Sequence, residues 1–414
     1  MSEPGAGRLS PEQLVDWLRL IRSENVGPRT FRQLVNRFGG AGPALEALPA
    51  LAAKARGREI RVATRDEVLR EIEATLALGG RFLTSGDPDY PAPLRQIDSA
   101  PPVLSLRGDA AVLARDCVAL VGSRNASAAG LAMTERLARG LAAQDLVIAS
   151  GLARGIDTIA HRAALESGTV GVLAGGLARP YPNENIALMD RIVARGGAVV
   201  TEMPLDWEPR GRDFPRRNRL VSGLALGVVV IEAARRSGSL ITARFALEQG
   251  RELFAVPGSP LDPRAEGCND LIRQGATLCA SPEDVTAALA RRGDRPPQPD
   301  LFREALDAPG EGDEPLIDEL DLFSLQERAK PAFARPQPPP QAQPGREEKD
   351  PPEPSPPDRD ARAVILALLG PSPAPLDALI RAAGVSAREA QSALLELDLE
   401  GRIIRHGTNL VSLR

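Results

Sequence analysis

The chain is poor in the residues on which most metal and redox sites depend. Its 414 residues include only three cysteines, at Cys117, Cys268 and Cys279, and two histidines, at His161 and His406. The cysteines form no CxxC pair, so we expect neither a zinc cluster nor a disulfide framework. We therefore predict a protein without a metal site.

Lysine is equally scarce. It occurs only at Lys54, Lys330 and Lys349, so the stretch 81–290 contains none. This absence excludes a lysine-dependent P-loop and a Schiff-base enzyme in that stretch.

Long apolar runs are also missing. The N-terminus has no apolar signal core, and no run is long enough to span a bilayer. The formal net charge of −4 does not suggest a nucleic-acid binder, but the acidic residues crowd the stretch 300–360. We expect a soluble cytoplasmic protein whose central part is less acidic than the total.

The stretch 118–176 organises the chain. Three short apolar runs, at 118–121, 146–149 and 170–173, each lead into glycine and suit strands buried on both faces of a parallel sheet. Segments of helical period at 128–143 and 157–167 lie between them. Strand, helix, strand, helix, strand with short joints predicts an α/β fold with a doubly wound, extended Rossmann-like sheet.

The turns after these strands carry the candidate chemistry, because ligands bind outside the carboxyl ends of such strands. We expect glycine there to let a ligand approach the backbone, hydroxyls to face it, and arginines to favour phosphate. Each turn alone could equally be a tight strand-to-helix joint. The candidate residues are Gly122, Ser123 and Arg124, then Ser150, Gly151, Arg154 and Gly155.

A second candidate stretch is rich in arginine. Arg216, Arg217 and Arg219 follow Phe214 and Pro215, and apolar residues come next. Guanidinium groups match phosphate oxygens, although a solvated run of charges would look the same. We expect at least two of these arginines to face the glycine turns, and we expect them to lie outside the core.

Further strands are predicted at 81–84, 103–106, 197–201, 228–231 and 253–256. Ser237, Gly238 and Ser239 precede another helix, with a serine as its cap. We expect Asp157 to cap its own helix and His161 to be packed. The roles of Asn218 and Glu202 stay open.

The two ends read as separate domains. Residues 1–80 predict three helices with a Val-Gly-Pro turn at 26–28, which resembles helix-hairpin-helix and SAM-like modules; a plain packing hairpin is the alternative. The acidic, proline-rich stretch 291–357 predicts a linker. Residues 358–414 predict three helices and a hairpin wing, as in a winged helix. Its third helix, at 387–400, carries four acidic residues, which favours protein binding over DNA reading.

Six motifs in order then carry a family resemblance. LVGSRNAS, SGLARGIDTIAH, YPNEN, FPRRNRLVSGLA, VVIEAARRSGSLITARFALEQGRELFAVPGS and GCNDLIRQGA cover most of the stretch 85–282. Together they resemble the DNA-processing protein A (DprA, also called Smf) family. One departure is Ala178, where the family commonly has aspartate.

The resemblance implies a homodimeric protein that binds single-stranded DNA without a nucleotide cofactor. It would protect incoming strands in natural transformation and load the RecA recombinase onto them against single-strand-binding protein. The resemblance places the DNA pocket at Gly122, Ser123, Arg124, Ser150, Gly151, Arg154, Arg216, Arg217 and Arg219, and we add Gly155, Asn218 and Ser237 to Ser239 as neighbours.

Aromatic residues make up only 3% of the chain. Single-strand binders usually stack bases on aromatic rings, and Phe214 and Tyr181 are the nearest candidates here. We therefore expect phosphate contacts to dominate and sequence preference to be slight.

An enzyme is the alternative. Nucleoside-monophosphate phosphoribohydrolases of the LOG type have a similar fold with a PGGxGTxxE motif. The nearest stretch here begins at Ser237 and has Phe245 in place of the motif glutamate. We therefore predict that the chain is not an enzyme.

Overall fold

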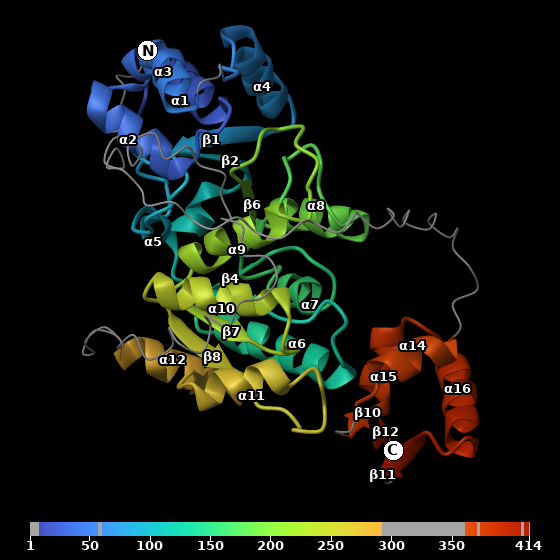
Figure 1. Cartoon of the computed structure of the whole chain (residues 1–414). Helices are drawn as coiled ribbons and strands as arrows, with labels where there is room; N and C mark the ends of the chain where they lie inside the picture. The colour runs from blue at the N-terminus through green and yellow to red at the C-terminus, as the bar shows by residue number, and fades with distance from the viewer. Residues whose placement is uncertain (1–7, 57–59, 292–360, 371–372, 407–409, 414) are drawn as a thin grey trace, which may run out of the picture.

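The computed structural model describes residues 8–56, 60–291, 361–370, 373–406 and 410–413. They form a helical N-terminal domain, a central α/β domain and a C-terminal winged-helix domain (Figure 1). This confirms the predicted fold class. The predicted linker lies, apart from its first residue, outside the described residues.

A nine-stranded sheet forms the centre of the molecule. Its strands are short runs of β-branched and small apolar residues, and most of them are buried along their whole length. The strands are β1 (Gly80–Thr84), β2 (Val103–Gly108), β3 (Cys117–Val121), β4 (Val147–Ser150), β5 (Thr169–Val172), β6 (Ala198–Thr201), β7 (Gly227–Val230), β8 (Glu252–Ala255) and β9 (Thr277–Leu278).

The order of the strands fixes where a ligand can bind. It is β1-β2-β6-β5-β4-β3-β7-β8-β9, and the strands from β3 to β9 are parallel. At one edge β2 pairs antiparallel with β6, and β1 pairs antiparallel with β2. The chain winds outward from β3 through β4 and β5 to β6, then crosses back to β7 on the other side of β3. The switch point of this doubly wound sheet therefore lies between β3 and β7, and sheets of this kind bind ligands outside the strand ends at that point.

Helices cover both faces of the sheet. One face packs on α6 (Ala128–Ala142), α7 (Ile156–Ala163), α8 (Ile186–Ala194) and α12 (Pro282–Ala290). The other face packs on α5 (Ala92–Arg95), α9 (Asp213–Leu224), α10 (Gly238–Glu248) and α11 (Glu266–Arg273). Short 3-10 turns lie at η1 (Ala110–Ala114) and η2 (Asn183–Asn185).

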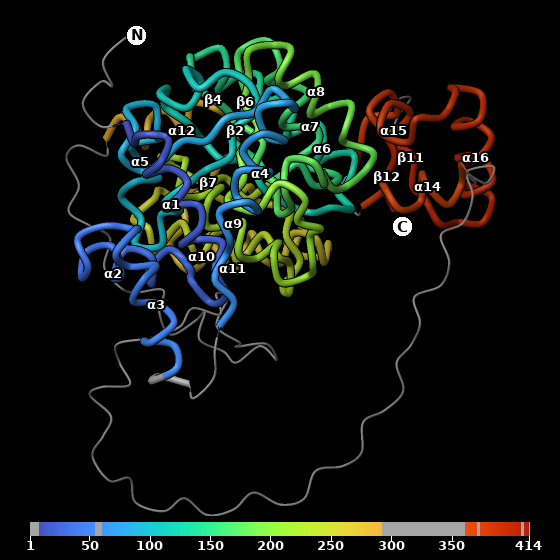
Figure 2. Tube along the Cα trace, turned by 90° about the horizontal axis from the view of Figure 1, so that it is seen from above, coloured from blue at the N-terminus to red at the C-terminus, as the bar shows by residue number. Residues whose placement is uncertain are grey.

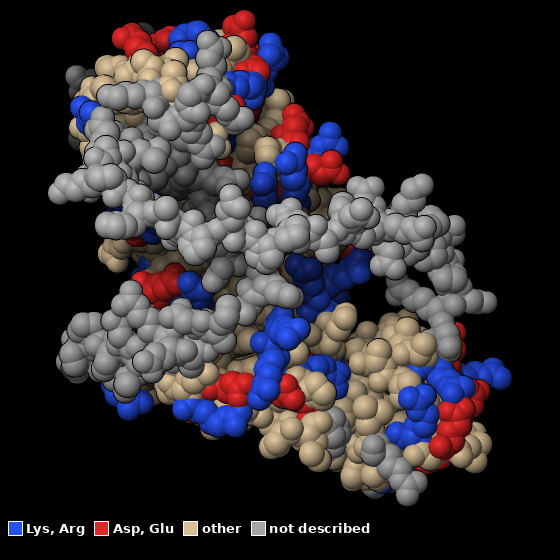
Figure 3. Space-filling model, in the orientation of Figure 1, with Lys and Arg blue, Asp and Glu red and all other residues tan. Residues whose placement is uncertain are grey.

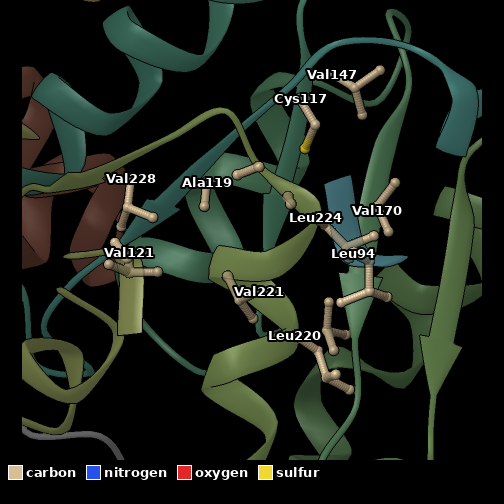
Figure 4. Close-up of a cluster of buried hydrophobic side chains, with 14 of the residues drawn as sticks. Leu94, Cys117, Ala119, Val121, Val147, Val170, Leu220, Val221, Leu224 and Val228 are labelled. Carbon is tan, nitrogen blue, oxygen red and sulfur yellow. The ribbon is translucent and has the colours of Figure 1, made fainter. Parts of the chain in front are cut away.

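Helix α9 is fixed by its apolar side. Leu220, Val221 and Leu224 point into the cluster formed with Ala119 and Val228 of the sheet (Figure 4). Because a crossover helix runs antiparallel to its strands, the first turn of α9 lies at the carboxyl edge of the sheet. The core thus holds the arginine-rich start of α9 at the edge where ligands bind.

The N-terminal domain has four helices instead of the predicted three. They are α1 (Pro11–Arg22), α2 (Pro28–Phe38), α3 (Ala41–Arg56) and α4 (Arg65–Ala77). The third one escaped prediction because it contains Pro49, which normally argues against a helix. It forms because Leu45, Leu48 and Ala52 are buried in the bundle core.

The winged-helix domain is built from α14 (Ala361–Leu368), β10 (Ala374–Pro375), α15 (Leu376–Ala383), α16 (Ala387–Leu399), β11 (Ile403–His406) and β12 (Leu410–Leu413). It packs on the start of α6, where Ala128 is buried among winged-helix residues. Arg264 donates to the carbonyl oxygens of Ala367 and Leu369 over 3.3 and 2.8 Å. In Figure 2 the domain lies beside α6 and away from the N-terminal helices.

No helix in the described ranges is both long enough and apolar enough to cross a bilayer.

Candidate nucleic-acid interface

The predicted turns meet at one edge of the sheet. The turn at 122–124 follows β3, the turn at 150–155 follows β4, and the segment 231–239 follows β7. The first two touch each other, because Ile156 N donates to the carbonyl oxygen of Ser123 over 3.2 Å. In Figure 3 a group of blue side chains lies near the middle of the face in view, and these are arginines because the sheet domain has no lysine.

An exposed arginine and two aromatic rings come together at this edge. The Arg124 guanidinium lies over the ring of Phe214, 5.2 Å from its centroid. The rings of Phe214 and Tyr181 meet edge to face, with centroids 5.6 Å apart. Tyr181 is 51% exposed. The three residues come from three separate segments, and they offer a cation beside stacking surfaces.

Arg154 is the second exposed cation of the turns. It pairs with Glu184, and both side chains are more than half exposed. The turn that carries it is held by buried Asn185, whose Nδ2 donates to the carbonyl oxygens of Leu152 and Ala153 over 2.8 and 3.1 Å. Asn185 thus positions the turn, a role that the YPNEN motif alone did not reveal.

Two glycines serve close contacts within the chain instead of leaving room for a ligand. A Cβ on Gly151 would lie 2.4 Å from the Arg217 guanidinium. Gly155 has φ +72°, and a Cβ there would lie 2.4 Å from the carbonyl oxygen of Ser123. Packing within the chain therefore accounts for glycine at these two positions, and the expected approach of a ligand stays a prediction. Gly238, by contrast, faces open space.

The hydroxyl of Ser150 does not face the edge, contrary to expectation. It is fully buried and donates to the carbonyl oxygen of Leu120 over 2.6 Å. Asp157 is not the cap of its helix either, because Gly155 occupies that position. Its Oδ2 instead accepts from the amides of Gly151 and Ala153 over 3.1 and 3.2 Å, which holds the turn in shape.

Arg217 is a core residue, 5% exposed. Its Nη1 donates to the carbonyl oxygens of Gly151 and Val172 at the ends of β4 and β5. Burial lowers the pKa of its guanidinium to about 10, although nearby Asp157 opposes the shift. Arg217 therefore supports the turn from below and does not point outward.

Arg219 is buried as well, at 2% exposure. Its Nη1 donates to the carbonyl oxygen of Ser99 over 2.6 Å, and its Nη2 pairs with Glu202. Arg216, with 26% of its side chain exposed, pairs with the other oxygen of Glu202 over 3.1 Å. The expectation that these arginines lie outside the core is wrong for Arg217 and Arg219.

Glu202 explains this arrangement. Burial by itself would raise the pKa of its carboxyl, but Arg216 and Arg219 outweigh burial and hold the pKa below its ordinary value. The glutamate is thus a charged anchor for the first turns of α9. The sequence left its role open because its partners follow it by 14 and 17 residues across a loop.

The segment after β7 lies against helix α9. Asn218 Nδ2 donates to the carbonyl oxygen of Gly238 over 3.2 Å. Ser237 caps α10 as predicted: its Oγ accepts from the amide of Ser239 and lies 2.7 Å from the Ser239 hydroxyl. These residues therefore neighbour the arginine-rich helix.

Glu232 was missed by the sequence prediction. It stands at the end of β7, and its carboxylate accepts from the backbone amide and the hydroxyl of Ser127. It thereby fixes the start of α6 directly after the Arg124 turn. A carboxylate 105 positions from its partner leaves no local signal in the sequence.

His161 is packed, as expected. It is fully buried, and its Nδ1 lies 2.8 Å from the Thr169 hydroxyl. Burial lowers its pKa to about 3. The ring is therefore neutral and shielded from any strand at the edge of the sheet.

Comparison with known proteins agrees with this architecture. The profile of the family described as DNA recombination-mediator protein A matches residues 81–290. Profiles of a DprA-like N-terminal HHH domain and a DprA winged helix domain match residues 11–74 and 349–408. Protein Smf of Synechocystis is 30% identical over 402 residues, which cover 94% of this chain and 95% of that protein. The chain belongs to the DNA recombination-mediator protein A family.

Other members are similar over part of the chain. Protein Smf of Escherichia coli is 45% identical over 202 residues, and the match spans about half of each protein: 48% of this chain and 54% of that one. The X-ray structure of DNA processing protein A from Streptococcus pneumoniae superposes with a TM-score of 0.56 at 33% identity, covering 68% of this chain and 98% of that one. The resemblance to this family that the motifs indicated is confirmed.

Proposed function

We propose that this chain binds single-stranded DNA at the carboxyl edge of its sheet and acts as a recombination mediator. The observation that carries the proposal is the group formed by Arg124, Phe214 and Tyr181. Single strands are held by cations that track the backbone and by rings on which bases stack, and every base offers such a face. Membership of a family described as recombination mediators supports the same conclusion.

The contacts divide into two kinds. Arg124, with Arg154 at the next turn, would neutralise phosphates, and the open surface at Gly238 leaves room for the strand. Phe214 and Tyr181 would stack bases without reading their identity. Arg217 and Arg219 take part only by holding the turn and helix α9 in place. Affinity should therefore depend on salt and little on sequence.

As a mediator, the chain would load the RecA recombinase onto strands covered by single-strand-binding protein, and so protect incoming DNA in natural transformation. It would work as a homodimer and without a nucleotide cofactor. Strand exchange by RecA on strands pre-covered with single-strand-binding protein measures this activity. Addition of the chain should shorten the delay before exchange, and an unchanged delay would contradict the loading role.

The winged helix serves a different task in this proposal. Helix α16 exposes Leu395 and Leu399, at 55% and 81%. Two acidic residues at its C-terminal end are tied within the domain: Asp398 pairs with Arg405 over 3.0 Å, and Glu400, which follows the helix, pairs with Arg362 over 2.5 Å. Exposed leucines one turn apart among carboxylates suit a protein partner better than a phosphate groove.

The decisive experiment is a titration with single-stranded and double-stranded oligonucleotides at two salt concentrations. Each phosphate contact contributes about −0.7 to the logarithmic salt slope for single strands. Arg124→Ala should flatten the slope by about 0.7, and Phe214→Ala should weaken binding by ~1–3 kcal/mol with the slope unchanged.

Arg139→Ala is the matched control. This arginine lies near the end of α6, is 69% exposed and pairs with a single glutamate, as Arg154 does. It should leave affinity and slope unchanged. Equal behaviour of Arg124→Ala and Arg139→Ala would contradict the proposed site.

A further inference from the structure

A cavity of about 680 Å³ lies between the N-terminal domain and the sheet domain. One wall is the turn from Ser23 to Gly27 at the start of α2, and the other is the segment 202–216 that leads into α9. This volume lies within the ~300–1,000 Å³ typical of ligand pockets. Neither the glycine turns nor Arg124 belongs to its lining.

The base of this interdomain cleft is held by buried contacts. Arg22, 9% exposed, forms a salt bridge with Glu71 over 2.9 Å. Its Nη1 also donates over 3.0 Å to the carbonyl oxygen of Glu202, at the carboxyl end of β6. The Arg22–Glu202 bond joins the two domains, as does a bond of 3.3 Å from the amide of Leu205 to Glu71, so the two walls of the cleft have a fixed separation. The shape of the cleft is therefore set by buried contacts of the fold.

The chemistry of the cleft suits a nucleic-acid strand. Its lining combines Trp207 with prolines and aliphatic residues, which offer flat apolar surfaces to bases. Arg61 and Arg212 lie on opposite walls and are exposed.

The carboxylates of the lining are already bonded within the protein. Glu202 is paired with two arginines, and Asp213 accepts from Trp207 Nε1 and Arg210 N, both over 2.8 Å. Glu24 accepts from the amide of Arg61 over 3.1 Å. Glu202 and Asp213 are also buried, so repulsion of phosphate by these groups is reduced.

The cleft and the Arg124–Phe214 group share the first turn of α9. Asp213, Pro215 and Arg216 line the cleft, while Phe214, between them in the same helical turn, carries the contact with Arg124. The Phe214 ring and the cleft therefore flank the same helical turn.

We infer that the cleft between the two domains holds a second segment of the same single strand, continuing from the Arg124–Phe214 site toward the turn at 23–27. This inference rests on the proposed function. It makes the N-terminal domain part of the DNA interface and predicts that long strands gain affinity from contacts that short strands cannot reach.

The chain supplies its own probe. Its only tryptophans are Trp17 and Trp207, and Trp17 packs against Phe31 with ring centroids 5.0 Å apart. The variant Trp17→Phe leaves Trp207 in the cleft as the sole indole. An oligothymidine of about 6 nucleotides lies near the lower end of the ~4–16 nucleotides that one binding module covers, and one of about 20 nucleotides exceeds that range. The long strand should change Trp207 emission, and the short one should leave it unchanged.

A charge variant tests the inference separately. Arg61→Ser with Arg212→Ser should flatten the salt slope for the long strand by about 1.4, from two phosphates at ~0.7 each, and leave the short strand unaffected. The control is Arg139→Ser with Arg195→Ser, which removes two exposed arginines near the ends of α6 and α8, away from the carboxyl edge. Thermal unfolding is the check that both double variants remain folded.

The outcomes separate the two proposals. If the short strand fails to bind the unaltered chain, the proposed function itself is wrong. If the short strand binds but the long strand leaves Trp207 emission unchanged, the cleft holds no DNA. The same conclusion follows if the two double variants have the same salt slope for the long strand. Equal losses for both strand lengths would also overturn the inference, because the cleft would then be no separate segment.

Discussion

Replacement of Arg219 by alanine should lower the free energy of unfolding of the sheet domain, and any loss of DNA binding should follow from that. The guanidinium is 2% exposed and holds Glu202, which is 7% exposed, and the carbonyl oxygen of Ser99. Removal of one partner from a buried ion pair costs about 3–5 kcal/mol, because the remaining charge stays buried. Since Arg216 still pairs with Glu202, we expect the lower end, about 3 kcal/mol.

Urea unfolding followed by circular dichroism measures this loss. For a denaturant slope of about 2–3 kcal/mol per M, a loss of ~3 kcal/mol lowers the midpoint by about 1–1.5 M. The matched control is Arg154→Ala, which breaks an exposed pair with Glu184 and should cost at most ~1 kcal/mol. An unchanged midpoint for Arg219→Ala would refute the assignment of this arginine to the core.

The same variant shows whether Arg219 only stabilises the fold or also contacts a DNA phosphate. In dilute buffer, where Arg219→Ala is still folded, its salt slope for single strands should equal that of the unaltered chain. A slope flattened by about 0.7 would show that Arg219 reaches a phosphate after all.

Three further outcomes are expected. Burial lowers the pKa of His161 from 6.5 to about 3, so below pH 6.5 the unfolded chain binds a proton that the folded chain does not. The free energy of unfolding should therefore fall as the pH drops below about 6.5. The variant His161→Gln should lessen that fall, as measured by urea midpoints across this pH range. A chain that ends at Pro296 should keep its single-strand affinity, and a loss above ~1.4 kcal/mol, a tenfold change, would assign DNA binding to the winged helix. Incubation with nucleoside monophosphates should release no free base above a buffer control, since Phe245 replaces the motif glutamate; measured release would make the chain an enzyme.

The sequence by itself determined the sheet and the position of its ligand edge. Buried parallel strands are short apolar runs that end in turn residues, so each strand from β3 to β8 carried its own local signal. The helices between them followed for the same reason. Two-residue β9 and proline-containing α3 were missed, because the first is too short for a period and the second contradicts local propensity.

Only the tertiary structure decided which arginines face solvent. The run at 216–219 lies inside helix α9, where successive side chains turn by about 100°. Arg217 therefore points away from Arg216 and Arg219, which lie three positions apart and both pair with Glu202. Their partners, Ser99, Gly151 and Val172, lie 45 to 120 residues away and meet α9 only once the sheet has formed. The pattern of charges therefore predicted a phosphate site at α9. In the structure two of its three arginines, Arg217 and Arg219, are buried and hold backbone carbonyl oxygens of the sheet domain. Exposed Arg124 meets Phe214 and Tyr181 only because the ends of β3, β5 and β6 converge at one edge.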